Sequence, residues 1–331
     1  MRIAIVGATG AVGRNMMAVL ENTEVNIDEL HLYASERSAG QRMSFKGIEL
    51  PVEKLTEDVF ARGYDYVLFS AGSEVAKHFA PIAAHYSNLV IDNSSAFRMD
   101  PAIPLVVPEI NGYLLKGYRG IVANPNCSTI QMLLALYRVH DRYQLSEIFV
   151  STYQSVSGAG YKGISEYEQQ LTGVYEPKVF AKRIAHNVIP LIGDLRDDIS
   201  QEEWKMINET RKILNSRTLG VYPTTVRVPV RIGHSEAIIA RTLFPIMSRA
   251  DLIETISSGE NVVVSDDIIT PVDVAGSDLT YVCRIRLFDA HTFGVWVVAD
   301  NLRVGAATNA VRILLKHASS SLSYKQVTQR Y

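Results

Sequence analysis

The sequence is poor in the features that mark disulfide scaffolds, membrane proteins and nucleic-acid-binding proteins. Its 331 residues include only two cysteines, Cys127 and Cys283, and neither has histidine neighbours at a zinc-ligand spacing. No apolar run approaches the roughly 18 residues of a membrane helix. The net charge is −2, with acidic and basic residues interspersed, so we expect no nucleic-acid partner and no membrane partner.

The beginning of the chain lacks the long apolar stretch that follows a basic start in a signal peptide. Together with the scarcity of cysteine, this predicts a cytoplasmic protein. Apolar residues make up 47% and charged residues 21%, a globular balance, and the length suits two domains of about 100–200 residues each. A chain of this size buries enough surface to need no structural metal, and we expect no metal site.

Over the first 125 residues, short β-branched runs alternate with helical patterns. This alternation predicts parallel βαβ units, and hence an α/β, Rossmann-type domain. The expected strands cover residues 3–6, 30–33, 66–70, 89–92 and 120–123, and the expected helices cover 11–20 and 76–85.

Beyond residue 127 the expected strands are longer and the helices fewer, which predicts an α+β domain around a mostly antiparallel sheet. A helix is expected at 129–140, and strands at 147–154, 224–232, 237–244, 262–265, 279–287 and 293–299. An apolar helix at 309–316 should return to the first domain. The expected domains are therefore 1–126 with 303–331, and 127–302.

A glycine-rich turn joins the first strand to the first helix. Its residues are Gly7, Ala8, Thr9, Gly10, Ala11, Val12 and Gly13. Glycines allow close approach of a pyrophosphate, and the N–H groups and dipole of the helix start attract its charge. The alternative is a βα turn that is glycine-rich for structural reasons alone, but the position after the first strand favours dinucleotide binding.

The end of the second expected strand bears on the choice of dinucleotide. An NAD site usually has a carboxylate there, and Glu36 is available. Arg37, flanked by Ser35 and Ser38, is better suited to the 2′-phosphate of NADP, although an exposed loop arginine is the alternative. We therefore predict NADP.

Cys127 stands at the expected start of a helix. A thiol in that position is a better nucleophile because the helix terminus stabilises the thiolate. Free cysteine is more often a small buried residue, as we expect for Cys283 within an apolar strand. Cys127 differs because its neighbours, Asn126 and Ser128, are polar. A thiolate near a nicotinamide site can form a thioester, the intermediate shared by aldehyde oxidation and acyl-phosphate reduction.

Such chemistry also needs a proton-transferring group, and His234 is the candidate because it follows an alternating strand and a glycine. The alternative is a surface histidine at a strand end. Arg227 and His234 are seven residues apart, which in one regular strand places them on opposite faces. They can share a site only if Pro229 or Gly233 interrupts the strand.

Six segments occur in the same order as in a known family. They are 7–13 (GATGAVG), 94–98 (SSAFR), 124–131 (NPNCSTIQ), 151–160 (STYQSVSGAG), 227–236 (RVPVRIGHSE) and 300–307 (DNLRVGAA). The sequence thereby resembles the aspartate-semialdehyde dehydrogenase family over nearly its whole length. The related N-acetyl-γ-glutamyl-phosphate reductases have a different cysteine context and lack the Thr-Tyr-Gln motif.

The resemblance implies a homodimer, or a dimer-based tetramer, that reduces β-aspartyl phosphate with NADPH and releases phosphate. That reaction belongs to lysine, threonine, methionine and diaminopimelate biosynthesis. The first domain would bind NADP, and the second would carry catalysis and dimerisation.

The same resemblance implies roles for individual residues. Cys127 would be the nucleophile, His234 the acid/base and Gln154 the group that orients the acyl carbon. The implied substrate-binding residues are Arg98, Asn126, Glu202, Lys205 and Arg227, and further cofactor contacts are Ser70, Ala71, Gly72, Ser157, Gly158 and Asn301.

Glu202 and Lys205 also have a purely structural interpretation. Ser200 and Glu203 form the pattern of a helix capping box, and the spacing of Glu202 and Lys205 is that of an ordinary i,i+3 surface pair.

Three classes of function remain open from the sequence. The first is the acyl-phosphate reductase, either the aspartyl enzyme or its N-acetylglutamyl relative. The second is an aldehyde-oxidising enzyme of the glyceraldehyde-3-phosphate dehydrogenase type. The third is a non-catalytic NADP-binding regulator, against which the presence of all four residues Cys127, Gln154, Arg227 and His234 argues.

Overall fold

The computed structural model describes the backbone of residues 1–328 and the side chains as far as Ser320. The chain divides into two compact units, which are described separately. The first comprises Met1–Pro125 and the chain from Ala306 onward, and the second comprises Asn126–Gly305. The sequence had placed these boundaries after residue 126 and before residue 303.

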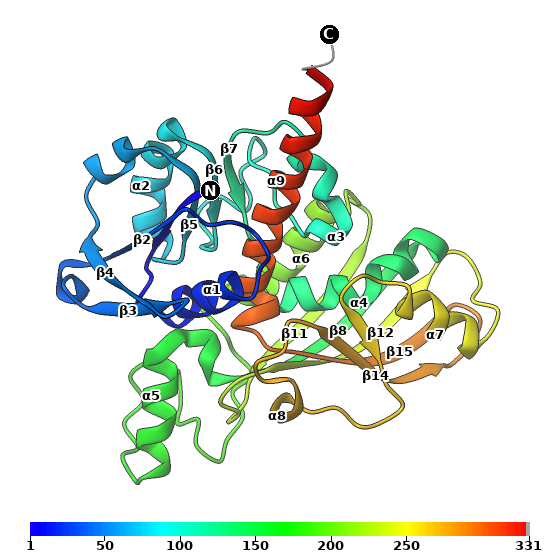
Figure 1. Ribbon diagram of the computed structural model, residues 1–331. Helices are drawn as coiled ribbons and strands as arrows, with labels where there is room; N and C mark the ends of the chain where they lie inside the picture. The colour runs from blue at the N-terminus through cyan, green and yellow to red at the C-terminus, as the bar shows by residue number, and fades with distance from the viewer. Residues whose placement is uncertain (329–331) are drawn as a thin grey trace. The chain divides into compact units, whose positions relative to one another are not determined.

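The first unit is built on a twisted parallel sheet with helices on both faces (Figure 1). The strand order is β3-β4-β2-β1-β5-β6-β7, in which only the edge strand β3 is antiparallel to its neighbour. The strands are β1 (Arg2–Val6), β2 (Glu29–Ala34), β3 (Arg42–Phe45), β4 (Ile48–Lys54), β5 (Tyr64–Phe69), β6 (Ser87–Asp92) and β7 (Gly120–Ala123). The predicted Rossmann-type domain is confirmed, although the β3–β4 hairpin was missed.

Alternating side chains of β1 show why both faces of this sheet are covered. Ile3 and Ile5 pack with helix α1 (Ala11–Glu21) and helix α9 (Asn309–Thr328), while Ala4 and Val6 pack with helix α2 (Ser73–Tyr86). These four side chains of β1 are fully buried, as expected of a central parallel strand. Shorter helical segments are η1 (Glu36–Ser38), η2 (Asp58–Arg62), α3 (Pro108–Asn111), η3 (Gly112–Leu115) and the π-helical η5 (Arg303–Thr308).

The second unit contains a six-stranded sheet in the order β11-β8-β12-β15-β14-β13. The three central pairings are antiparallel and the two outer ones are parallel, which confirms the mostly antiparallel prediction. The strands are β8 (Leu145–Gln154), β11 (Gly220–Arg227), β12 (His234–Thr242), β13 (Val262–Val264), β14 (Thr280–Leu287) and β15 (Thr292–Ala299).

Helices cover one face of this sheet. Helix α4 (Cys127–Tyr143) lies across β8, β12, β15 and β14, flanked by α6 (Gln201–Ile213) and α7 (Arg249–Ser257) (Figure 1). The inward positions of β12 are His234, Glu236, Ile238 and Ala240, all buried, whereas Ile239 on the opposite face is 45% exposed. The remaining elements are η4 (Val156–Ala159), α5 (Gly160–Leu171), β9 (Leu195–Arg196), β10 (Ile199–Ser200) and α8 (Pro271–Val274).

The strand predicted over residues 224–232 is wrong at its C-terminal end. Strand β11 stops at Arg227, and β12 begins at His234, three residues before its predicted start. Pro229, which has no N–H, and Gly233, with φ of 96°, lie in the connection between them. Arg227 and His234 therefore belong to two different strands, both of which pair with β8, and the expected conflict of faces does not arise.

Within the described residues, no helix is long and apolar enough to cross a membrane.

Candidate active site

In the first unit, the glycine turn has the shape that a dinucleotide site requires. Gly7 has φ of 84°, and a Cβ at this position would lie 2.6 Å from the Ser70 carbonyl oxygen. A Cβ at Gly13 would lie 2.3 Å from the Gly7 carbonyl oxygen. Helix α1 begins at Ala11 without a side-chain cap, so its N-terminus can receive an anion. These residues fit a bound pyrophosphate.

The turn after β2 contains Glu36 and Arg37, the two candidates for contact with the adenosine ribose or its 2′-phosphate, and they differ in their partners. Glu36 forms an ion pair with Lys54 at 3.1 Å. Arg37 is exposed and makes no ion pair or hydrogen bond within the described residues. The positive charge is thus the one that remains available to a ligand. Ser70, Ala71 and Gly72 follow β5, the strand next to β1.

In the second unit, Cys127 is the first residue of α4, as the sequence predicted. Asn126 caps this helix: its Oδ1 accepts from Thr129 N at 3.2 Å. Asn126 Nδ2 donates to Glu202 Oε1 at 2.7 Å, and Asn126 N donates to Glu209 Oε2 at 2.6 Å. Two carboxylates of α6 therefore fix the residue that precedes the thiol.

Glu209 was missed by the sequence reasoning. It is 1% exposed and stands seven residues after Glu202, on the same face of α6. That spacing is the signal that would have found it.

Glu202 and Lys205 form an ion pair at 3.1 Å, but it is not the surface pair that helix spacing suggested. Glu202 is 5% exposed and also accepts from Gln154 Nε2 at 3.4 Å. Burial raises the pKa of Glu202, but Lys205 and the hydrogen bond from Asn126 outweigh it, so the pKa lies below its ordinary value. The carboxylate is ionised at neutral pH. The predicted Ser200–Glu203 capping box is present and begins α6.

Arg227 and Gln154 are paired in register at the ends of β11 and β8. Arg227 Nη1 donates to Ser155 O at 2.7 Å, and its guanidinium lies 5.7 Å from the centre of the Phe180 ring. Burial lowers the pKa of Arg227, opposed by the negative charges of Glu202 and Cys127. Arginine nevertheless stays protonated in proteins. Arg227 is therefore a buried cation close to the thiol.

His234 is fully buried, and Ser155 fixes its ring. Ser155 N donates to Nδ1 at 3.1 Å, and Ser155 Oγ lies 3.1 Å from the same nitrogen. Because a backbone N–H can only donate, Nδ1 carries the lone pair, and the proton of the neutral ring is on Nε2. Nε2 has no hydrogen-bond partner among the described residues. Nε2 is therefore the ring nitrogen left to donate a hydrogen bond to another group.

Burial, reinforced by the charge of Arg227, lowers the pKa of His234 to about 3. The ring is therefore neutral at pH 7. Gly158 allows Arg227 and His234 to face a common point: a Cβ there would lie 2.6 Å from Arg227 Nη1 and 3.3 Å from His234 Nε2. Gly305 allows the backbone to approach Cys127 closely, since a Cβ at residue 305 would lie 2.6 Å from Cys127 Cβ.

Asn301 joins the loops on either side of His234. Its Oδ1 accepts from Ser155 Oγ, Ser157 Oγ and Gly233 N, each at 3.0 Å. The structure thus gives this oxygen a positioning role within the protein. Its predicted contact with the cofactor, like those of Ser157 and Gly158, stays a prediction.

The second unit alone brings together most of the predicted catalytic and substrate-binding residues, namely Asn126, Cys127, Gln154, Glu202, Lys205, Arg227 and His234. Arg98 belongs to the first unit, where its Nη2 donates to Asn93 O at 3.0 Å. Within the described part of the chain, no group of three or more His, Cys, Asp or Glu side chains is arranged to hold a metal ion.

Two family models match the chain, and both describe semialdehyde dehydrogenases. The NAD binding domain matches residues 2–118, and the dimerisation domain matches residues 136–304. Aspartate-semialdehyde dehydrogenase from Aquifex aeolicus is 45% identical over 94% of this chain and 96% of its own length. The Bacillus subtilis protein of the same name is 41% identical over 95% and 96%. The chain belongs to the aspartate-semialdehyde dehydrogenase family.

A solved structure agrees with this assignment. Aspartate semialdehyde dehydrogenase II from Vibrio cholerae, complexed with ASA, has a TM-score of 0.92 and 43% identity, covering 96% of this chain and 98% of its own. Membership of an aspartate-semialdehyde dehydrogenase family makes the chain an oxidoreductase with a nicotinamide cofactor site in its first unit.

The buried neutral His234 predicts a specific loss of stability in acid. Its native pKa of about 3 lies below the ordinary 6.5, so between these values the unfolded state binds a proton that the native state does not. As the pH is lowered through this window, the free energy of unfolding should therefore decrease, by up to about 1.4 kcal/mol per pH unit. Between about pH 6.5 and 5, the free energy of unfolding of His234→Asn should decrease by roughly 1–2 kcal/mol less than that of the unaltered protein. Urea unfolding at the two pH values measures both decreases.

His78 supplies the control, because it is 59% exposed and pairs with Glu57 at the surface. His78→Asn should keep the acid sensitivity of the unaltered protein. If His234→Asn also keeps it, His234 is not held neutral in the native state.

Proposed function

We propose that this protein catalyses the NADPH-dependent reductive dephosphorylation of β-aspartyl phosphate to aspartate β-semialdehyde through a thioester on Cys127. The product would feed lysine, threonine, methionine and diaminopimelate biosynthesis. The observation that carries the proposal is the placement of a helix-start thiol next to a buried arginine and a buried neutral histidine. The comparisons do not favour the alternatives, the N-acetyl-γ-glutamyl-phosphate reductase and the non-catalytic regulator.

The thiol performs the first half of the reaction. The Cys127 thiolate, stabilised by the start of α4 and by Arg227, attacks the acyl carbon. A C–S bond forms, the bond from that carbon to the phosphate oxygen breaks, and phosphate leaves. When bound, NADPH supplies the hydride that reduces the thioester. Breakage of the C–S bond then releases the aldehyde and returns the thiolate.

His234 acts on the oxygen of the reacting carbon. Its neutral ring presents Nε2–H to this oxygen as negative charge develops there. The interaction is strong because the ring is excluded from water. Ser155 holds the ring in this orientation by donating to Nδ1, because the hydrogen bond made by one ring nitrogen sets the role of the other.

Charged groups of α6 and β11 account for the choice of substrate. Arg227 offers a planar fork to the α-carboxylate, and the ionised Glu202 offers a negative charge to the α-ammonium group. Lys205 and Arg98 are assigned to the phosphate, and Gln154 to the acyl group. An N-acetylated substrate has no ammonium charge, so it would gain no ionic contact with Glu202, whose partners would remain Lys205 and Asn126.

The function predicts a phosphate-dependent formation of NADPH when the pure protein receives aspartate semialdehyde and NADP. Cys127→Ala should abolish this turnover and keep NADP binding. His234→Ala should lower kcat by about 10²–10³-fold, the usual cost of removing one hydrogen-bond donor to a developing oxyanion. Cys283→Ala is the matched control. Cys283 is fully buried in β14, where it has no part in the proposed mechanism, so this variant should stay active. Substantial turnover in Cys127→Ala would overturn the thioester mechanism.

The preference for NADP over NAD is assigned to Arg37. One charge-assisted hydrogen bond to the 2′-phosphate is worth about 1.5–3 kcal/mol, so Arg37→Ala should weaken NADP binding roughly ten- to hundredfold. NAD, which lacks this phosphate, should bind as before. Lys77, exposed in the same unit and paired with Glu74, provides a control variant, Lys77→Ala. Equal weakening of both cofactors in Arg37→Ala would refute the assignment.

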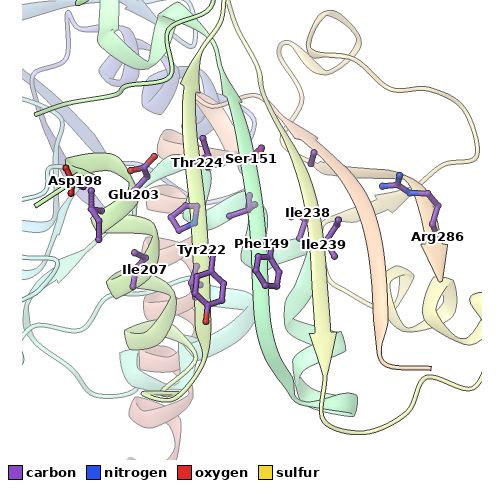
Figure 2. Close-up of a pocket in the computed structure, with 15 residues that line it drawn as sticks. Phe149, Ser151, Asp198, Glu203, Ile207, Tyr222, Thr224, Ile238, Ile239 and Arg286 are labelled. Atoms are coloured by element: carbon purple, nitrogen blue, oxygen red, sulfur yellow. The ribbon is translucent and has the colours of Figure 1, made fainter. Parts of the chain in front are cut away.

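We assign self-association to the sheet face that the helices leave uncovered. Tyr222, Phe149 and Ile239 come from β11, β8 and β12, are paired in register and form a row across this face (Figure 2). The Tyr222 and Phe149 rings stack with centres 4.8 Å apart, and the three side chains are 39–52% exposed. They line a hollow of about 820 Å³. An apolar row of this kind, within the region matched by a dimerisation domain, suits a second copy of the chain.

A charge placed in this row should prevent dimerisation. Tyr222→Asp should elute as a monomer in size-exclusion chromatography with light scattering, under conditions where the unaltered protein is a dimer or tetramer. Tyr113→Asp provides the control, because Tyr113 is 72% exposed and belongs to the first unit, outside the region matched by the dimerisation domain. If Tyr222→Asp keeps the native mass, the interface lies elsewhere.

A further inference from the structure

Glu236 is a fully buried carboxyl group for which the proposed mechanism has no use. It lies two residues after His234 on β12 and points to the same, helix-covered face of the sheet. Neither of its carboxyl oxygens has a hydrogen-bond partner among the described residues. An acidic side chain in this condition needs a physical explanation.

The groups around Glu236 come from three elements. Helix α4 contributes Ser128 and Gln131, from its first two turns, and the strands contribute Thr152 of β8 and Val297 of β15 at the paired positions. The nearest titratable residues along these elements are Cys127, next to Ser128, Tyr153, next to Thr152 with its ring against Trp296, and His234, which is neutral. No cation among the described residues offsets a charge on Glu236.

The hydrogen-bonding capacity of Gln131 indicates which form of Glu236 is present. Gln131 Nε2 donates to the carbonyl oxygen of His234 at 3.4 Å, while Gln131 Oε1 is buried without a donor among the described residues. An ionised carboxylate can only accept, so it would leave this oxygen unsatisfied. A protonated carboxyl group can donate to it. Burial also raises the pKa of Glu236 well above its ordinary value, opposed only by Gln131 and Ser128.

We infer that Glu236 is a neutral carboxylic acid and a positioning residue, whose proton is shared with Gln131 and ties the start of α4 to the start of β12. These two starts carry Cys127 and His234. Because the group is neutral, the tie adds no negative charge beside the thiolate, where a second anion would oppose ionisation of the thiol. The consequence for catalysis depends on the proposed function, whereas the protonation state does not.

Infrared spectroscopy of the full-length protein at neutral pH tests the protonation state directly. The difference spectrum between the unaltered protein and Glu236→Gln should show the loss of a protonated carboxylic acid C=O band. Glu202→Gln is the matched control, because Glu202 is also buried but is ionised, and its difference spectrum should show the loss of carboxylate bands. Loss of carboxylate bands in Glu236→Gln would overturn the inference, whether or not the protein has the proposed activity.

Kinetics test the positioning role. Glu236→Gln keeps a donor and should retain kcat, KM and the pH dependence of Cys127 alkylation by iodoacetamide. Glu236→Leu removes the tie and should lower kcat by up to about 10²-fold at nearly constant KM, because small misplacements of reacting groups cost this much. Gln131→Leu should reproduce that loss from the other partner.

Two results would overturn the role. A shift of the alkylation midpoint to lower pH in Glu236→Gln would show that the native group is charged. Unchanged kcat in Glu236→Leu or Gln131→Leu would show that no tie is needed. If Glu236→Leu does not fold, Gln131→Leu alone decides the second point.

Discussion

Asn126 is the point on which the arrangement of the second unit depends. Its backbone and side chain are held by two carboxylates of α6, Glu209 and Glu202, while its Oδ1 caps α4. The direction and starting residue of α4 follow from these bonds, and the thiol of Cys127 is the first side chain of that helix. An N-cap is typically worth about 1 kcal/mol, but here it also sets the position of the Cys127 thiol.

Buried charge around the thiol is balanced rather than avoided. The ionised Glu202 lies with Lys205 and near Arg227, so the two cations are partly compensated before any substrate arrives. His234 remains neutral in the same neighbourhood because burial and Arg227 both disfavour its charged form. One carboxylate and two cations are thus gathered here, the charges that the proposed substrate, with its ammonium, carboxylate and phosphate groups, would need opposite it. Such a site recognises charge pattern as well as shape.

The sequence predicted the parts of this structure whose signals are local. The glycine turn, the helix start at Cys127 and the capping box at Ser200 each depend on a few adjacent residues, and each is present. The strand assigned to 224–232 was wrong because alternation alone does not show where Pro229 interrupts pairing. The burial of Glu202 and the role of Glu209 depend on α6 packing against the Asn126 loop, a tertiary contact that helix periodicity does not reveal.

The two faces of the six-stranded sheet carry different sets of side chains, because successive residues of a strand point to opposite faces. Gln154, Arg227 and His234 point toward the helices, while Phe149, Tyr222 and Ile239 on the same strands point the other way. A one-residue slip in any of β8, β11 or β12 would exchange these sets, burying a side chain such as Phe149 and exposing one such as His234. Association on the open face would bury the flat side of the same three strands. It would thereby stabilise the register that keeps Gln154, Arg227 and His234 on the helix-covered face.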